Sequence, residues 1–258
     1  MEKTISEYKQ YSEDSVAVWK ERFTWKRNGK DPQYRTSIVR YIKESPDFEN
    51  VVKEGVPTDS AKFFEVISAL AEKYVSWACK KDDYKKAEEK DMRDFFVGVM
   101  GEYFFYFLMT DVKCIECCNE NNEYNRYDFR YTYPYLVKDF GIDLVSAISS
   151  KNQGDQSCAI QVKFWNPFND EMPDMSVFQK LGYEAYRKDY ADPKKDKNLF
   201  FCWLGEESKI YKLLESNKDL QKSVVVIGHQ SLQKTVNNSN NFFWKGLFDS
   251  ILEYKNVA

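Results

Sequence analysis

Two short stretches, "GIDLV" at residues 141–145 and "AIQVKFW" at 159–165, decide which fold this sequence can adopt. Each is an apolar segment around a single charge, which is Asp143 in the first and Lys163 in the second. Short apolar runs of this kind are typical of buried strands. We therefore expect strands at about 141–148 and 158–165, and these strands carry one acid and one base into the core.

A third isolated charge, Glu102, lies in the preceding apolar segment. It is the only charged side chain between Asp94 and Asp111. The segment 95–109, "FFVGVMGEYFFYFLM", is apolar on every face, which predicts a helix buried on all sides. An unpaired carboxylate is costly to bury, so we expect the three isolated charges to find one another.

Strand geometry supports such a meeting. Successive side chains of a strand point to opposite faces, so Gln161 and Lys163 share one face. Asp143 can join them if the two strands are neighbours, and Glu102 can complete the group from the helix. Two acids, an amide oxygen and an ammonium form a site for a hard divalent cation beside a phosphate. The alternative is a buried ion pair between Asp143 and Lys163, with Glu102 reaching solvent or capping.

The remaining pattern predicts the fold class and the domains. Strands are expected at 112–118, 199–205 and 223–228, and helices at 59–81, 175–190 and 241–255, with a loop or irregular hairpin over 119–140. This order predicts an α/β fold with a central mixed β-sheet flanked by helices, and with an N-terminal, mostly helical extension. We expect the extension to span residues 1–93 and the sheet domain to span 94–258.

Composition limits the class of protein. The 258 residues are 43% hydrophobic, 17% aromatic and 31% charged, which suits a soluble chain with a large core. Because no apolar run approaches the roughly 20 residues of a membrane span and the start lacks a secretory pattern, we expect a cytoplasmic protein without membrane contact. The six cysteines are then reduced thiols. The "CIECC" of 114–118 raises a zinc alternative, but small core side chains suit its spacing better.

The net charge of −3 argues against a protein coated in positive potential, although one local basic stretch exists. Residues 20–43 hold eight basic and two acidic side chains, and Lys26 and Arg27 lie at the centre of the stretch. Four aromatic residues are interleaved, namely Phe23, Trp25, Tyr34 and Tyr41. Such a mixture can hold phosphates and stack on bases. A solvated face or a contact with an acidic partner explains it equally well.

The two opening stretches resemble the PD-(D/E)XK nuclease superfamily, and they are most similar to its Mrr-like branch. The tripeptide Gln161-Val162-Lys163 matches the QxK form of the second motif. The segment "GEYFFYFL" is similar to the family's first helix, whose glutamate corresponds to Glu102, and "VVVIGHQSLQKTV" is similar to the end of the core. The resemblance covers about residues 94–236. It departs from the family pattern at Gly141-Ile142, where proline usually precedes the acid.

The resemblance implies a restriction-endonuclease-like core and a role for each residue. Asp143 would bind Mg²⁺ or Mn²⁺ together with the side-chain oxygen of Gln161 and the carbonyl of Val162. Glu102 would bind the metal through water. Lys163 would orient or help deprotonate the attacking water and would stabilise charge on the phosphate. The implied reaction is hydrolysis of a phosphodiester that leaves 5′-phosphate and 3′-hydroxyl ends.

The resemblance also implies partners. The substrate would be DNA, gripped by Arg126 and Arg130 of the 119–140 segment and by Lys180 of the helix after the lysine motif. An ordinary amphipathic helix is the alternative for that helix. The chain would be the effector subunit of a bacterial restriction or anti-phage system, as a homodimer or beside an NTPase or helicase. The alternative function is a non-catalytic nucleic-acid-binding or scaffold subunit with a degenerate nuclease fold.

Overall fold

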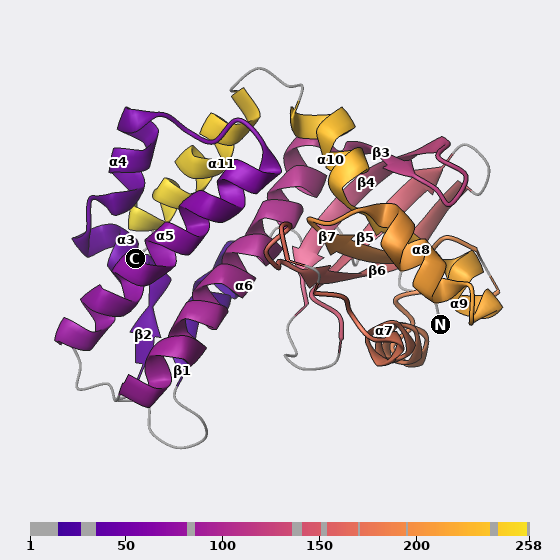
Figure 1. Cartoon of the computed structure of the whole chain (residues 1–258), viewed down its shortest axis with the longest axis horizontal. Helices are drawn as coiled ribbons and strands as arrows, with labels where there is room; N and C mark the ends of the chain where they lie inside the picture. Colours follow the sequence, from indigo (N-terminus) through magenta and orange to yellow (C-terminus); the bar gives the residue numbers. More distant parts are fainter. Residues whose placement is uncertain are drawn as a thin grey trace. The chain divides into compact units, whose positions relative to one another are not determined.

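The computed structural model describes residues 15–26, 35–81, 86–135, 141–150, 154–169, 171–194, 196–237 and 242–256. The chain divides into two compact units. The first unit consists of Met1–Ser15 and Glu102–Asn238, and the second of Val16–Gly101 and Ser239–Ala258. Each unit has its own elements, drawn in Figure 1, and each is described by itself below.

A six-stranded mixed sheet forms the centre of the first unit. Its strands follow one another in chain order across the sheet. They are β3 (Cys114–Cys118), β4 (Tyr124–Pro134), β5 (Leu144–Ser150), β6 (Gly154–Lys163), β7 (Leu199–Trp203) and β8 (Val224–Ile227). Neighbours from β3 to β6 are antiparallel, while β6, β7 and β8 are parallel. The expected α/β class with a mixed sheet is therefore confirmed.

The longest strand, β4, lies where a loop or irregular hairpin was expected. Its buried residues Tyr127 and Phe129 alternate with polar ones, as a half-buried strand requires. The pairing with β5 then shifts between Arg130 and Tyr133, and Tyr131 takes a positive φ of 56°. This bulge breaks the period of two, which is why the sequence pattern alone suggests an irregular segment.

The sheet is strongly curled. The ring of Phe200 on β7 lies 5.3 Å from that of Tyr127 and 5.1 Å from that of Phe129, both on β4. Three strand spacings would separate these strands by about 14 Å in a flat sheet, so the sheet must bend around the rings. The edge strands β3 and β8 accordingly contact each other.

A tyrosine joins the two edge strands. Helix α8 (Glu207–Leu214) carries Tyr211, whose hydroxyl donates to the carbonyl of Cys118 on β3 and accepts from the N–H of Val226 on β8, each at 3.1 Å. Both groups belong to strand edges that would otherwise be unpaired. The hydroxyl therefore replaces a missing ladder contact between β3 and β8.

Helices cover the convex face of the sheet. Side chains of α7 (Met175–Arg187), α8 and α9 (Lys218–Ser223) share one apolar cluster with Val145, Ala159 and Phe201. The short helix α10 (His229–Leu232) follows β8 and leads into η3 (Gln233–Asn237). The fully buried carboxylate of Glu207 accepts hydrogen bonds from the N–H groups of Gly228, Gln230 and Ser231 and from the Ser231 hydroxyl, which fixes the start of α10.

The second unit is mostly helical, as expected for the N-terminal region. Its elements are α2 (Ser15–Arg22), β1 (Thr24–Lys26), β2 (Arg35–Ser37), α3 (Ile38–Glu44), α4 (Asp47–Glu54), α5 (Ser60–Lys81), η1 (Lys86–Glu88), α11 (Phe242–Glu253) and η4 (Tyr254–Asn256). The long helix α6 (Glu89–Phe107) crosses the division of the chain at Gly101–Glu102 and continues into the π-helical turn η2 (Leu108–Val112).

The closing helix α11 belongs to the second unit, whereas the sequence suggested a domain running from 94 to 258. Trp244 packs on Phe63 with ring centroids 5.7 Å apart, and Phe248 packs on Phe48 at 6.3 Å. The Lys255 ammonium also pairs with Glu49 at 2.6 Å. The apolar stripe of α11 therefore completes the core formed by α4 and α5, and the division falls after residue 101 rather than after 93.

One helical stretch, Glu89–Val112, is long and apolar enough to cross a membrane by length and composition. Half of its apolar window is buried inside the fold. Phe96, Met100 and Phe104 are fully buried along it. A core helix meets the same criteria, and this burial favours that interpretation of α6 and η2.

Candidate active site

Asp143 lies at the point where β5 and β6 separate. It immediately precedes β5, and its N–H donates to the carbonyl of Ile160 while its carbonyl accepts from the N–H of Tyr135, each at 2.8 Å. Its side-chain Oδ2 accepts from the N–H of Val162 at 2.7 Å. A strand N–H points along the plane of the sheet, so the carboxylate lies at that level and replaces the next ladder partner of β6.

Gln161 contacts Asp143 directly. Its Nε2 donates to Oδ2 of Asp143 at 2.5 Å, and the Gln161 side chain is buried with 5% of its surface exposed. Ala159, two residues earlier, belongs to the apolar cluster beneath α7. Because side chains alternate along a strand, Gln161 and Lys163 lie on that same face. The structure thus brings Asp143 and Gln161 together, as the sequence predicted.

Gly141 permits the approach of the chain to α7. Its φ is +76°, and a Cβ at this position would lie 3.1 Å from Cγ of Lys180 and 3.4 Å from Oε1 of Gln161. Glycine adopts positive φ without the steric cost of a Cβ. The glycine at this position therefore has a physical reason.

Lys163 ends β6 at the carboxyl edge of the three parallel strands, where it pairs with Trp203 of β7. Ligands of open α/β sheets commonly bind beyond this edge. The side chain is half-buried, and its ammonium lies 6.0 Å from the ring centroid of Trp165. Within the described residues the ammonium forms no ion pair, so the alternative of a buried Asp143–Lys163 pair does not account for it.

Glu102 is half-buried on α6, in the part of this helix that belongs to the same unit as the sheet. Phe104, two residues further, contacts Phe164 after the end of β6 with ring centroids 6.3 Å apart. Two residues advance a helix by about 200°, so Glu102 lies on the side of α6 away from this contact. The joining of Glu102 to the other three residues stays a prediction.

The geometry around Gln161 suits a cation. Its Nε2 lies 2.5 Å from Oδ2 of Asp143 and 3.5 Å from the carbonyl oxygen of Val162, so a positively polarised group stands between two of the predicted metal ligands. A half-turn of the amide would present Oε1 in place of Nε2, which gives a carboxylate, an amide and a carbonyl oxygen of the kind Mg²⁺ takes. The residues present therefore fit such an ion.

Among the described residues no group of three or more His, Cys, Asp or Glu side chains is placed to hold a metal ion. The predicted ligand set contains only two carboxylates, Glu102 and Asp143, so this finding does not test it. The same finding argues against a metal site formed by the cysteines.

All six cysteines are free thiols, and Cys117, Cys118, Cys158 and Cys202 are buried. Burial raises the pKa of the Cys202 thiol, and the nearby Cys117 and Asp143 raise it further.

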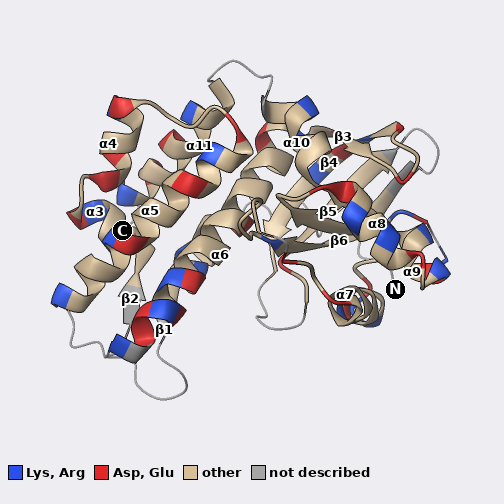
Figure 2. Ribbon diagram, in the orientation of Figure 1, with Lys and Arg blue, Asp and Glu red and all other residues tan. Residues whose placement is uncertain are grey.

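The predicted nucleic-acid contacts of the first unit are exposed. Arg126 on β4 pairs with Asp128 at 3.3 Å, and Arg130 lies further along the same strand. Lys180 is exposed on α7, next to Gly141. Figure 2 shows that α7, α8 and α9 carry both signs of charge. None of these helices therefore presents a uniformly positive face.

The basic stretch of residues 20–43 is only partly available. Phe23 and Tyr41 are fully buried in the core, which excludes them as stacking platforms for bases. Arg22 is 5% exposed and lies over the ring of Trp19, while Arg40 pairs with Glu44 at 2.8 Å. The structure describes the main chain of Lys26 but not its side chain, and Arg27 lies outside the described residues.

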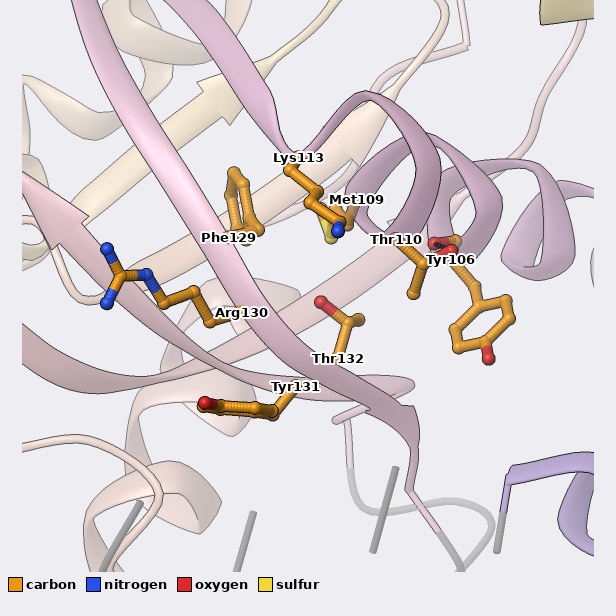
Figure 3. Close-up of a pocket in the computed structure, with 8 residues that line it drawn as sticks. All are labelled: Tyr106, Met109, Thr110, Lys113, Phe129, Arg130, Tyr131 and Thr132. Atoms are coloured by element: carbon orange, nitrogen blue, oxygen red, sulfur yellow. Dashed lines mark hydrogen bonds between the residues drawn. The ribbon is translucent and has the colours of Figure 1, made fainter. Parts of the chain in front are cut away.

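A pocket at the end of α6 was not predicted. It measures about 470 Å³ and is lined by Tyr106, Met109, Thr110, Lys113, Phe129, Arg130, Tyr131 and Thr132 (Figure 3). We call it the η2 pocket. Lys113 and Tyr131 both adopt positive φ, which neither residue type signals in a sequence. Of the residues that line the pocket, only Arg130 had been singled out from the sequence, as a predicted DNA contact.

The sequence and the structure were compared with known proteins, and neither comparison identified a relative. No protein-family model matches the chain, and no curated protein or solved structure is significantly similar to it.

Proposed function

We propose that the chain is a metal-dependent endonuclease that hydrolyses DNA phosphodiester bonds, with a restriction-endonuclease-like core. One observation carries the proposal. The Gln161 amide nitrogen stands between the carboxylate of Asp143 and the carbonyl of Val162, with Lys163 on the same face of the strand. These are the residues that the resemblance assigns to the metal and the reacting phosphate.

The residues would divide the work as follows. Asp143, Gln161 and Val162 would hold Mg²⁺ or Mn²⁺, with Glu102 acting through water. The ion would supply Lewis-acid stabilisation and a water of lowered pKa. Lys163 would orient that water toward phosphorus and stabilise the charge that develops on the phosphoryl oxygens. As the new P–O bond forms, the attacking water gives up a proton and the bond to the 3′ oxygen breaks. The leaving oxygen takes a proton from solvent, so the products carry 5′-phosphate and 3′-hydroxyl ends.

A second candidate, a non-catalytic nucleic-acid-binding or scaffold subunit, has its own support. Asp143 accepts from the N–H of Val162, which would otherwise be unpaired where β5 leaves β6. This structural role would keep Asp143 useful in a chain without catalysis. The two candidates differ in what they expect of Lys163, because its ammonium forms no ion pair within the described residues and lies 6.0 Å from the ring centroid of Trp165.

A plasmid-cleavage assay separates the candidates. Full-length protein is incubated with supercoiled plasmid and Mg²⁺ or Mn²⁺, beside the Lys163→Ala variant and a Lys218→Ala control from the exposed start of α9. The nuclease proposal expects nicking or linearisation by the wild type and the control, and a loss of at least about a hundredfold in Lys163→Ala. Equal DNA binding by all three proteins without cleavage, both for the purified protein and for a complex purified from its host, supports the scaffold and contradicts the nuclease.

We also propose that the chain works within a bacterial defence system and with partner proteins. An effector subunit of a restriction or anti-phage system would act in the cytoplasm, as a homodimer or with an NTPase or helicase. Cleavage assays should therefore also be run on protein purified from its native host with whatever co-purifies. Cleavage that appears only in such a complex, and that Lys163→Ala abolishes, still supports the nuclease.

A further inference from the structure

The η2 pocket has the size of a site for a small organic molecule. Its volume of about 470 Å³ lies within the range of several hundred Å³ that such ligands occupy. It lies where α6 passes through η2 into β3, beside the bulge of β4. All eight lining residues belong to the first unit.

The lining chemistry selects an anion. None of the eight lining side chains is acidic, and two of them, Lys113 and Arg130, are cationic. The hydroxyls of Thr110 and Thr132 are already bonded within the protein, to the carbonyl of Tyr106 and to Ser146, each at 2.9 Å, so the positive charges decide the preference. In Figure 3 Arg130 extends away from most of the other side chains, whereas Lys113 is directed toward Met109 and Thr110. Lys113 is exposed, and its ammonium has no ion-pair partner in the described part of the chain. A lysine ammonium commonly binds phosphate as a point charge.

The backbone of Lys113 is strained in a way that stability does not explain. Its φ of 64° and ψ of −38° lie in a region that only glycine adopts cheaply, and the residue ends a π-helical turn. A side chain in such a region costs roughly 1–3 kcal/mol. A cation at a helix C-terminus returns only about 0.3–1 kcal/mol. A glycine here would therefore be more stable, which suggests that the ammonium serves a ligand.

We propose that the η2 pocket binds a nucleoside monophosphate. The phosphate would meet the ammonium of Lys113, and the nucleoside would lie against the half-buried ring of Tyr106. A nucleoside 5′-monophosphate group occurs in a free nucleotide and also at the 5′ end of a cleaved DNA strand. The inference does not depend on the nuclease proposal, since it needs neither metal nor Lys163.

Calorimetric titration tests the ligand class. The full-length protein, with EDTA present, is titrated with the four nucleoside 5′-monophosphates, with adenosine and with inorganic phosphate. We expect saturable binding of at least one nucleotide, tighter than that of adenosine or phosphate alone. A 5′-phosphorylated oligonucleotide and its 5′-hydroxyl counterpart then distinguish a strand end from a free nucleotide. Binding of none of the four nucleotides below millimolar concentration, or equal binding of adenosine, overturns the proposal.

A glycine variant tests the role of Lys113. Lys113→Gly removes the ammonium and the strain, so we expect a higher melting temperature together with nucleotide binding weakened by about tenfold or more. Lys197→Gly is the matched control, because Lys197 also has a positive φ, of 58°, and does not line the pocket. Unchanged nucleotide affinity in Lys113→Gly overturns the proposal, as does an equal loss in both variants. Lys163→Ala should bind nucleotides like the wild type, which separates this result from the cleavage assay.

Discussion

Asp143 has one role that the structure shows and a second role that is proposed. One carboxylate oxygen satisfies the N–H of Val162 and the amide of Gln161, and the same carboxylate is the predicted metal ligand. Substitutions at this position can therefore distinguish the two roles, because the structural role depends on an acceptor oxygen and the catalytic role depends on the charge.

The first prediction concerns Asp143 itself. Asp143→Ala leaves two donors without an acceptor, so we expect it to lower the free energy of unfolding by about 1–3 kcal/mol. Asp143→Asn keeps an acceptor oxygen and should cost less than about 1 kcal/mol, while still abolishing cleavage because the charge is lost. Urea denaturation measures both values. Equal costs for the two variants would show that the charge, rather than the hydrogen bonds, stabilises this region.

A second prediction concerns Gly141, the residue that lets the chain approach α7. Gly141→Ala places a Cβ at positive φ and 3.1 Å from Lys180, so we expect a loss of about 1–2 kcal/mol in stability. Gly98→Ala is the control, since no atom outside its own helix lies within 4 Å of that Cβ and the change should gain up to about 1 kcal/mol. Thermal unfolding of both variants checks the opposite signs.

Among the elements, α4 owes part of its stability to a carboxylate that responds to pH. Burial acts to raise the pKa of Asp47, but hydrogen bonds from Ser45 and Tyr41 and the Lys73 ammonium outweigh it, so the pKa is lowered overall. The Tyr41 hydroxyl donates to Asp47 at 2.6 Å. A lowered folded pKa means that this stability is present above the ordinary pKa and is lost as the pH falls through the folded one.

The third prediction follows from this sign. Asp47→Asn should lower the melting temperature relative to the wild type at about pH 7, and the difference should be smaller at about pH 3, because that pH lies below the ordinary carboxyl pKa and the stability is lost as the pH falls toward the lowered folded pKa. Melting curves of the two proteins at both pH values provide the measurement. A difference that stays constant would mean that Asp47 acts through packing and not through its charge.

The elements also show where a sequence pattern is sufficient. The strands β5 and β6 follow from continuous apolar segments, and α5 and α7 follow from apolar residues at helical spacing. The pattern fails at β4, because the bulge at Tyr131 interrupts the alternation. It fails at the η2 pocket as well, because nothing in the residue type of Lys113 indicates a positive φ.

At the scale of the whole molecule, the division into two units depends on long-range complementarity. The pattern of α11 predicts an apolar stripe, but not which core receives it. Only the structure shows that Trp244 and Phe248 meet Phe63 and Phe48. The sequence alone predicts that Asp143 and Gln161 meet, because they lie on strands that are neighbours in the chain. The position of Glu102 cannot be predicted in this way, because it depends on how a separate helix packs.

The fourth prediction tests this division. Trp244 is fully buried, so Trp244→Ala should cost about 3–5 kcal/mol. Hydrogen exchange should accelerate in α4 and α5 more than in the strands β5–β7. Phe242→Ala, whose side chain is 84% exposed, is the control and should change stability by less than about 0.5 kcal/mol. Equal acceleration in the strands would contradict two separate cores.

The hydroxyl of Tyr211 has a consequence for self-association. Because it occupies groups on both β3 and β8, at the two margins of the curled sheet, neither margin readily accepts a strand from another molecule. Continuous sheets shared between subunits, and runaway β-polymerisation through these margins, are therefore disfavoured. A dimer of this protein would accordingly use a surface other than these two margins.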